Sequence, residues 1–302
     1  MRPVEQLTAE PLDSPLEPME LGEGPLWLGG ERVSWVDISA GRVFDGRVAE
    51  QAVQLAAVHE VGGDVGAAIP LPDGAGWILA ADQGFARLAL DGTATQLAQP
   101  ELALHGRSVR MNDAKADPRG RLWAGSKAHD DTPGAGTLWR VDLDGDVTAV
   151  RSGFTITNGI GWSPDGATMY VIDSVPGVVW SHPYDLDSGG IGRASALIDA
   201  GWPPGAAPDG LCVDDDGALW IACWGGGVVQ RHAPDGRLLA RVAVAAGQPS
   251  SCCLAGDTLL ITTAAMSLDP RQPGDGRLFA CHVGAGVGAP AATPFRGALP
   301  EA

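Results

Sequence analysis

The chain has 302 residues, of which 45% are hydrophobic, so it is long enough to bury a sizeable core in one large domain or two ordinary ones. Its 20 Lys and Arg residues stand against 37 Asp and Glu. The resulting net charge of −17 argues against nucleic acid or an anionic membrane as a partner, because both need clustered cations. The 43 Gly and 23 Pro residues favour many turns and short strands over long helices.

The N-terminal segment, MRPVEQLTAEPLDSPLEPME, carries acidic residues and prolines and lacks the apolar stretch of a secretory signal. No run of 18 apolar residues occurs anywhere, so no transmembrane helix is expected. The five cysteines include no C-x-x-C pair, which favours free buried thiols in a reducing compartment over a zinc site. The sequence therefore predicts a soluble cytoplasmic protein, a monomer or weak oligomer, with a small molecule as its partner.

A turn followed by a short apolar strand recurs six times along the chain, at intervals of 40 to 50 residues. The copies are GGERVSWVDI (29–38), PDGAGWILAAD (72–82), DPRGRLWAGS (117–126), SPDGATMYVIDS (163–174), DDDGALWIAC (214–223) and AGDTLLITTA (255–264). Each is followed by a second strand that begins with Gly. These second strands are predicted at 41–48, 84–93, 136–147, 177–189, 227–238 and 276–283. Strands separated by Asp/Gly turns are typical of β-hairpins.

A period near 45 residues that contains several strands and no helical stripe is typical of a β-propeller blade. The six copies predict an all-β fold, a six-bladed β-propeller with four-stranded antiparallel blades around a central channel. We expect a single domain over residues 1–302, with residues 1–19 as an N-terminal segment for which pairing into the last blade is one option. A set of tandem sandwiches is the alternative, and the regular period disfavours it.

Polar side chains precede four of the repeated strands, where a channel-lining strand should be apolar. Glu23 lies in LGEGPLW, Asn112 in RMNDAKADPRG, Asn158 in TITNGIGWSPDG and Asp209 in GAAPDGLCVDDDG. Glu, Asn and Asp oxygens from separate blades would form a cage suited to a hard divalent cation. The alternative is that NG and DG are ordinary turn pairs, an interpretation that recurrence in register weakens.

These motifs resemble those of the SMP-30/gluconolactonase/luciferin-regenerating family, which are six-bladed propellers that include regucalcin-type lactonases. GEGPLW, RMNDAKADPRGRLWAGS, TNGIGWSPDGATMYVIDS, PDGLCVDDDGALWIACWGGG and SSCCLAGDTLLITTA match family segments in the right order over roughly residues 20–283. The resemblance implies one divalent metal ion, which could be calcium, zinc, manganese or magnesium. By the same likeness, Glu23, Asn158 and Asp209 are its protein ligands.

The resemblance also implies that Arg110 and Asn112 bind the substrate's oxygens, whereas Asp113 braces the loop. Where several relatives carry a glutamate and a longer lid, this chain has SKAHDDTPGAG at 126–136. Asp130 is the expected substrate-binding replacement, with Asp131 as the alternative, and the altered loop leaves the sugar preference open.

The function that follows by similarity is that of a carboxylic ester hydrolase, a gluconolactonase-like enzyme that opens sugar lactones to aldonic acids. The hypothesis is that a divalent ion polarises the carbonyl and that Asp209 orients or deprotonates the attacking water. Asp173, in YVIDS, is a candidate outer partner of the metal site, with an ordinary strand-end residue as the alternative. Two alternatives stay open: an organophosphate or aryl-ester hydrolase on the same site, and a non-catalytic calcium-binding propeller.

Overall fold

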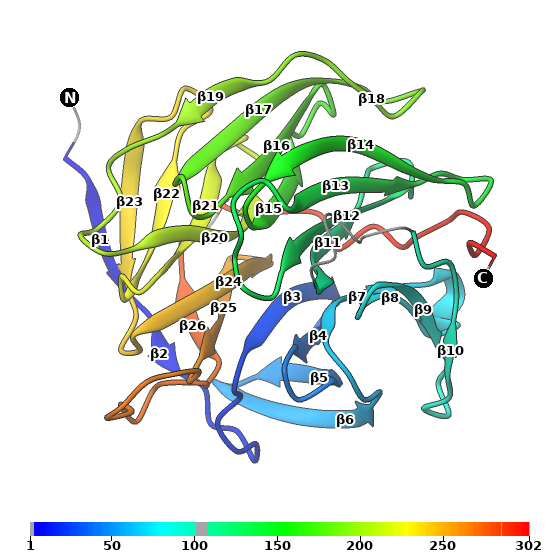
Figure 1. Cartoon of the computed structure of the whole chain (residues 1–302). Helices are drawn as coiled ribbons and strands as arrows, with labels where there is room; N and C mark the ends of the chain where they lie inside the picture. Colours follow the sequence, from blue (N-terminus) through cyan, green and yellow to red (C-terminus); the bar gives the residue numbers. More distant parts are fainter. Residues whose placement is uncertain (1–2, 101–107, 285, 302) are drawn as a thin grey trace.

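The computed structural model describes residues 3–100, 108–284 and 286–301, and it confirms the predicted six-bladed β-propeller. Six small sheets surround a central channel in Figure 1, each following the last in chain order. Within the described residues the one helical element is a short 3-10 turn, η1 (Pro72–Gly74). No helix in this part of the chain has the length and apolar character that crossing a membrane requires.

In blades one to three the strands follow one another in chain order from the channel outward. Blade one contains β3 (Gly22–Gly29), β4 (Arg32–Asp37), β5 (Arg42–Ala49) and β6 (Ala52–Glu60), and blade two contains β7 (Val65–Pro70), β8 (Trp77–Ala81), β9 (Gly84–Leu88) and β10 (Ala94–Gln96). Blade three contains β11 (Val109–Ala116), β12 (Leu122–Ala128), β13 (Gly136–Val141) and β14 (Val147–Phe154). Blade four contains β15 (Thr157–Trp162), β16 (Thr168–Asp173), β17 (Val178–Asp185), β18 (Gly190–Ile191) and β19 (Ser195–Ile198). Blade five contains β20 (Ala207–Val213), β21 (Leu219–Trp224), β22 (Val228–His232) and β23 (Leu238–Ala243), and blade six contains β24 (Gln248–Ala255), β25 (Thr258–Ala264) and β26 (Phe279–His282).

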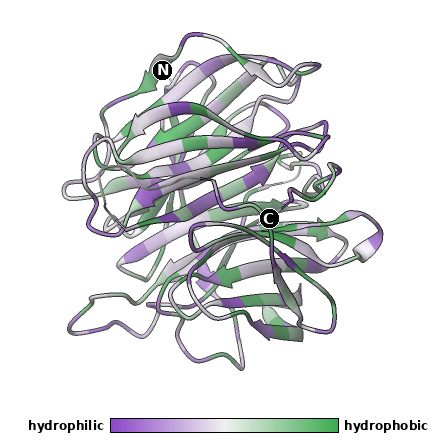
Figure 2. Ribbon diagram, turned by 45° about the vertical axis from the view of Figure 1, so that its right-hand side comes forward, coloured by the Kyte–Doolittle hydropathy of each residue, from purple (hydrophilic) through white to green (hydrophobic). Residues whose placement is uncertain are grey.

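Each of the six repeated apolar segments forms the second strand of a blade, and its Gly-initiated successor forms the third. The large side chains that anchor these second strands pack between neighbouring blades, and Trp35, Trp123 and Trp220 are almost completely buried. Hydrophobic residues are spread through the sheets (Figure 2), and the second strands are buried along nearly their whole length, as in β8 and β21. The blades therefore pack against neighbours on both faces. The core is therefore a ring of interfaces between sheets.

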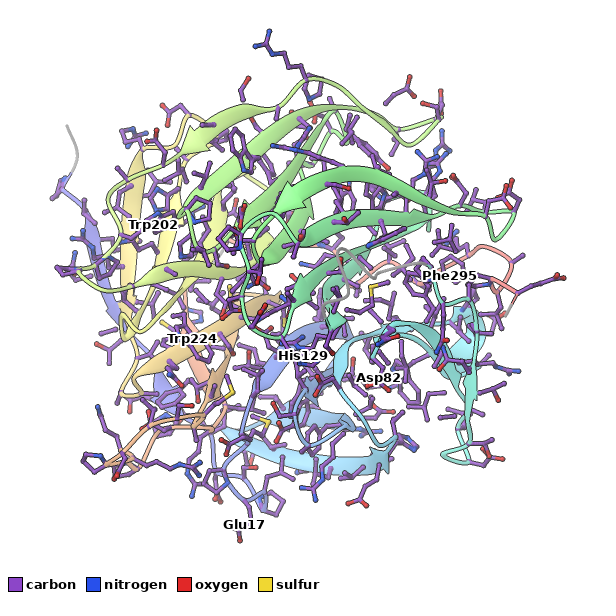
Figure 3. All side chains as sticks on the ribbon, in the orientation of Figure 1. Glu17, Asp82, His129, Trp202, Trp224 and Phe295 are labelled. Atoms are coloured by element: carbon purple, nitrogen blue, oxygen red, sulfur yellow. The ribbon has the colours of Figure 1, made fainter. Side chains whose placement is uncertain are left out.

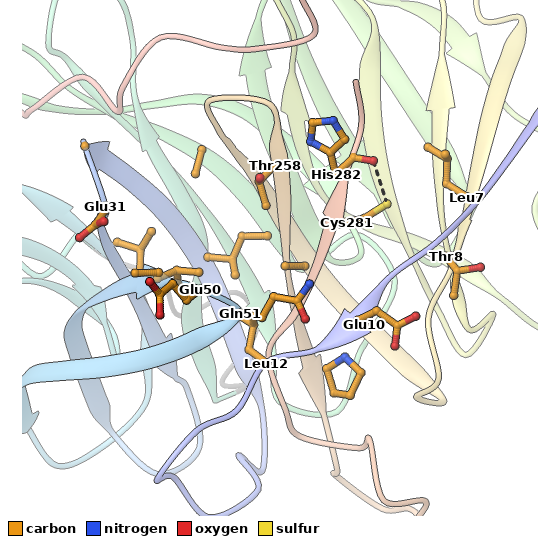
Figure 4. A pocket seen from close by; sticks show the side chains of 18 residues that line it. Leu7, Thr8, Glu10, Leu12, Glu31, Glu50, Gln51, Thr258, Cys281 and His282 are labelled. Carbon is orange, nitrogen blue, oxygen red and sulfur yellow. Dashed lines mark hydrogen bonds between the residues drawn. The ribbon is translucent and has the colours of Figure 1, made fainter. Parts of the chain in front are cut away.

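The N-terminal segment connects the last two blades. β1 (Glu5–Thr8) pairs in parallel with β23, and β2 (Glu10–Pro11) supplies the outer strand of blade six by pairing with β26. This pairing covers strand edges that would otherwise be exposed. A cavity of about 470 Å³ lies beside β2 at the junction with blade one, with Leu12, Gln51 and Thr258 in its wall (Figure 4).

The C-terminal residues 288–298, the C-terminal strap, cross several blades as an extended coil (Figure 1). Gly288 O of the strap accepts from Asp215 N of blade five. Ala292 N donates to Trp27 O in blade one, and Phe295 N donates to Pro70 O in blade two. Arg296 N then bonds Gly120 O of blade three. Because the strap is hydrogen-bonded to four blades, it holds together parts of the ring that are not neighbours.

Candidate active site

The innermost strand of every blade contains a β-bulge near its beginning. The breaks in pairing fall between Glu23/Leu26, Val65/Ala67, Met111/Ala114, Asn158/Ile160, Pro208/Leu211 and Pro249/Ser251. A bulge leaves a residue unpaired and redirects its side chain. The four polar residues singled out from the sequence all lie at these bulges. The repeated irregularity thus brings side chains from separate blades to one level of the channel.

The glycines that follow Asn158 and Asp209 belong to these bulges and not to turns. Asn158 and Gly159 lie within β15, and Asp209 and Gly210 within β20. A Cβ atom on Gly159, where φ is +33°, would lie 2.6 Å from Asp209 O, and one on Gly210 would lie 2.0 Å from Ser251 Oγ. The turn-pair interpretation of NG and DG is therefore wrong here. Glycine is required because neighbouring inner strands approach closely.

A cavity of about 340 Å³ opens at this level of the channel. Its polar wall includes Glu23, Arg110, Asn112, Asn158 and Asp209, which come from blades one, three, four and five. The sequence-predicted metal and substrate residues, apart from Asp130, are thus brought together in space although they span almost 190 positions of the chain.

Amide and carboxylate groups in the cavity form a hydrogen-bonded chain across three blades. Asn112 Nδ2 donates to Asn158 Oδ1 at 2.6 Å and to Thr157 O at 3.1 Å. Asn158 Nδ2 in turn donates to Asp209 Oδ1 and to Ser174 Oγ. These contacts fix the orientation of each side chain, because every one is buried and has few alternative partners.

The two carboxylates in the cavity are buried with little compensating charge. Glu23 is 5% exposed and Asp209 is 6% exposed. Burial, followed by repulsion from Asp209 and Asp113, raises the pKa of Glu23 well above its ordinary value. Burial and the Asp113 charge do the same to the pKa of Asp209, and Lys127 and Arg110 only partly oppose the shift.

A divalent cation fits this donor set, since two buried carboxylates that repel one another are stabilised by a positive charge between them. Within the described part of the chain, no group of three or more His, Cys, Asp or Glu side chains is arranged to hold a metal ion. A cation in the cavity would therefore use an amide oxygen together with the two carboxylates. Asn158 is the amide beside Asp209, but its Nδ2 faces that carboxylate and its Oδ1 accepts from Asn112, so the amide would have to turn over to offer its oxygen to a cation.

Arg110 is a buried cation at the wall of the cavity. One guanidinium nitrogen donates to Met111 O and to Asn112 Oδ1, both at 2.8 Å, and Nε lies 3.5 Å from Asp64 Oδ2. Burial lowers the pKa of Arg110, an effect that Asp64 and Glu23 oppose. Asp64 comes immediately before the inner strand of blade two and is the residue through which that blade contacts Arg110 in an ion pair. Its place before a repeated inner strand, in GGDVG, was the available sequence signal.

Asp113 lies behind the cavity wall. Burial raises the pKa of Asp113, an effect that Lys115 and the nearby backbone N–H groups of Ala114 and Ile160 oppose. Asp113 lies within β11, beside Asn112, and its expected role in bracing the segment stays a prediction. Its negative charge adds to the repulsion at Glu23 and Asp209.

The structure separates the two adjacent aspartates of the blade-three loop. Asp130 turns its carboxylate onto Thr132, accepting the backbone N–H at 3.2 Å and the hydroxyl at 2.7 Å, and it does not line the cavity. Asp131 does line the cavity and forms an ion pair with Lys127. The local turn decides the difference, because Asp131 adopts a left-handed backbone conformation with φ +53°.

Several residues of the site carried no recognised signal in the sequence. Lys127, Ser174, Trp224 and Gln248 line the cavity. Asp173 accepts the backbone N–H groups of Thr155 and Ile156, so it supports the segment that leads to Asn158 and makes no contact with that side chain among the bonds described.

The fold and site together define a class: a six-bladed β-propeller whose channel holds buried carboxylates, amides and an arginine at one end. The SMP-30/Gluconolactonase/LRE-like region model matches residues 21–265. The chain therefore belongs to the SMP-30/gluconolactonase/LRE-like family, as the motifs predicted.

Named relatives have similar length and sequence. The chain is 32% identical to the pentonolactonase XacC of Haloferax volcanii over 252 residues, 81% of each chain. It is 31% identical to regucalcin of Xenopus laevis over 296 residues, 93% of this chain and 96% of the relative. Among solved structures, a calcium-binding protein, regucalcin, from Agrobacterium tumefaciens superposes with a TM-score of 0.86 at 29% identity, covering 98% of this chain and 100% of the other.

Proposed function

We propose that this protein is a metal-dependent lactonase that hydrolyses sugar lactones to the open acids. The observation that carries the proposal is the pair of buried, mutually repelling carboxylates, Glu23 and Asp209, joined through Asn158 beside the buried cation Arg110. Such an arrangement opposes the charged form of both carboxylates, and a bound cation would relieve that opposition. The pentonolactonase and the family description support lactone as the substrate class.

Glu23, Asn158 and Asp209 would hold the divalent cation, calcium, zinc, manganese or magnesium. When bound, such a cation supplies stabilisation of negative charge on a carbonyl oxygen and lowers the pKa of nearby water. The chain's own contribution is to bring the three side chains to one cavity. Ser174 and Asn112 contact the Asn158 amide from two sides and are the groups that would exchange partners when the amide turns its oxygen toward a cation.

Asp209 is the proposed proton acceptor for the attacking water, because its second carboxylate oxygen is not committed to Asn158. Arg110 and Asn112 are the proposed substrate-binding residues. The Arg110 guanidinium stays cationic and can bind a substrate oxygen on which negative charge develops. Asp64 keeps that guanidinium in place through its contact with Nε.

The cysteines support a reducing compartment. All five are free and buried, and Cys212 Sγ lies 3.8 Å from Cys252 Sγ without a disulfide bond. Buried free thiols are typical of proteins of the cytoplasm, which is the location we propose.

The test is a pH-stat assay on a panel of aldonolactones, with chelator-treated protein and with each of the four metals restored. Spontaneous lactone opening is subtracted, and Asp209→Ala is run beside the wild type. We expect turnover that depends on metal and is lost in the variant. Turnover of aryl esters or organophosphates alone would replace the proposed substrate class. No turnover with a stoichiometrically bound ion would identify a binding protein and overturn the proposal.

A further inference from the structure

One strand position has the same geometry in all six blades. In each blade the inner strand has one residue just before its bulge, and a residue at the end of the second strand lies opposite it. The pairs are Gly22–Asp37, Arg110–Lys127, Thr157–Asp173, Ala207–Trp224 and Gln248–Ala264, and in blade two Asp82 follows the pair Val65–Ala81. The residues at the end of the second strands are called the strand-end positions, and they are Asp37, Asp82, Lys127, Asp173, Trp224 and Ala264.

Three of the strand-end positions hold an aspartate that supports the backbone. Asp37 accepts the N–H groups of Glu20 and Leu21, both at 3.0 Å. Asp82 accepts the N–H of Asp64 at 2.8 Å, and Asp173 accepts those of Thr155 and Ile156. None of these three aspartates lines the cavity. The common role of the position is therefore to hold the segment that leads into the inner strand.

Lys127 and Trp224 depart from this role. Both occupy strand-end positions, in blades three and five, and both line the cavity. The Lys127 side chain is 13% exposed and its ammonium group pairs with Asp131, another lining residue. Trp224, labelled in Figure 3, is half-buried and packs against the apolar cluster that contains Ile38 and Ala264.

The two side chains offer complementary chemistry on separate parts of the cavity wall. The Lys127–Asp131 pair presents an ammonium donor and a carboxylate acceptor, which together can bind adjacent hydroxyl groups. The indole of Trp224 presents a flat apolar surface that can cover the C–H face of a ring. A ring with hydroxyl groups on one side and C–H bonds on the other matches both surfaces at once.

From this geometry we infer that Lys127 and Trp224 select polyhydroxylated lactones over unsubstituted ones, with the substrate hydroxyls on Lys127 and the ring's C–H face on Trp224. The inference rests on the proposed lactonase function and specifies its substrate selection. Lys127 and Trp224 act on selectivity, whereas Glu23, Asn158 and Asp209 act on all lactones alike.

The test compares kcat/KM for D-glucono-1,5-lactone with kcat/KM for δ-valerolactone, which has the same ring and no hydroxyl groups. The ratio of the two values measures selection of hydroxyls and cancels losses common to both substrates. In Lys127→Met we expect this ratio to fall about tenfold, the loss that one charge-assisted hydrogen bond represents. Trp224→Leu should lower the ratio about threefold, mostly through KM for the gluconolactone.

Two further variants act as controls. Lys127→Arg keeps a cationic donor and should restore most of the ratio, which a merely structural role of Lys127 would not require. Asp37→Asn occupies the matched strand-end position outside the cavity, and it should leave the ratio unchanged even if both rates decrease. Circular dichroism of each variant confirms that the fold is retained.

The outcomes separate this inference from the function on which it rests. If the wild type hydrolyses neither lactone with any of the four metals, the lactonase proposal itself is overturned. If the wild type hydrolyses both, and the Lys127→Met and Trp224→Leu ratios match the wild type or change no more than that of Asp37→Asn, only the inference is overturned.

Discussion

The two ends of the central channel are built from the same six inner strands but differ in character. At the beginning of these strands, Glu23, Arg110 and Asp209 bury charge around a cavity of about 340 Å³. At their far end lies a cavity of about 570 Å³ whose wall is mainly apolar, with residues such as Leu26 and Leu254 and part of the C-terminal strap. The charged residues in that wall, Lys115, Asp214 and Asp215, belong to blades three and five. The two ends differ in how buried charge is balanced: Glu23 and Asp209 repel one another at the charged end, whereas the buried Asp214 at the other end is paired with Arg231. Packing of the strap stabilises that second end.

The largest expected effect is at the charged end. Asp209→Ala should reduce kcat/KM for its best lactone by at least about 1,000-fold, because the residue is proposed both to hold the cation and to accept a proton. The measurement is initial rate by pH-stat at saturating metal. A variant with more than a tenth of wild-type activity would show that this end of the channel is not the catalytic one.

The opposite end should respond in stability and not in activity. Phe295 of the strap has no exposed surface and packs in the cluster between blades two and three. Phe295→Ala should therefore lower the free energy of unfolding by about 3–5 kcal/mol, measured by urea denaturation. Leu143→Ala is the control, since Leu143 bonds the strap through its backbone and its side chain is 44% exposed.

We expect Phe295→Ala to keep kcat/KM within about twofold of the wild type at a temperature where it is folded, because no strap residue lines the charged cavity. A loss of activity without a loss of stability would mean that the two ends are coupled, and it would contradict the separate roles expected for them.

Metal should stabilise the charged end specifically. A cation at about 100 times its Kd should raise the free energy of unfolding by about 2.7 kcal/mol. Asp209→Asn should lose this gain. It should also be more stable than the wild type when no metal is present, because the burial and Asp113 repulsion that raise the pKa of Asp209 oppose its charged form. Thermal melting with chelator and with each metal measures both effects, and an equal metal response in the two proteins would contradict the assignment.

A smaller effect is expected at Asp64, which contacts Arg110 without lining the cavity. Asp64→Asn should lower kcat/KM about tenfold, since the guanidinium loses one of the groups that orient it. Arg110→Lys in the same background distinguishes positioning from direct action. If Asp64 acts through Arg110, the double variant should be no slower than Arg110→Lys alone.

Much of the fold could be predicted because its signals are local. Each blade repeats a turn, an apolar strand with a large anchor such as Trp35 or Trp220, and a second strand that begins with Gly. The path of the C-terminal strap could not be predicted, because its backbone bonds to Trp27 and Pro70 join residues more than 200 positions apart and follow no periodic pattern. The placement of Phe295 depends on those bonds.

The sequence by itself determined the six-bladed propeller, the family, and the gathering of Glu23, Asn158 and Asp209, because a regular repeat brings equivalent positions to one level of a ring. Only the tertiary structure decided that Asp131 and not Asp130 lines the cavity, and that Lys127 and Trp224 line it as well. The physical reason is that side-chain direction at a bulge or turn depends on backbone angles and on the neighbouring blade, which the spacing of residues along the chain does not specify.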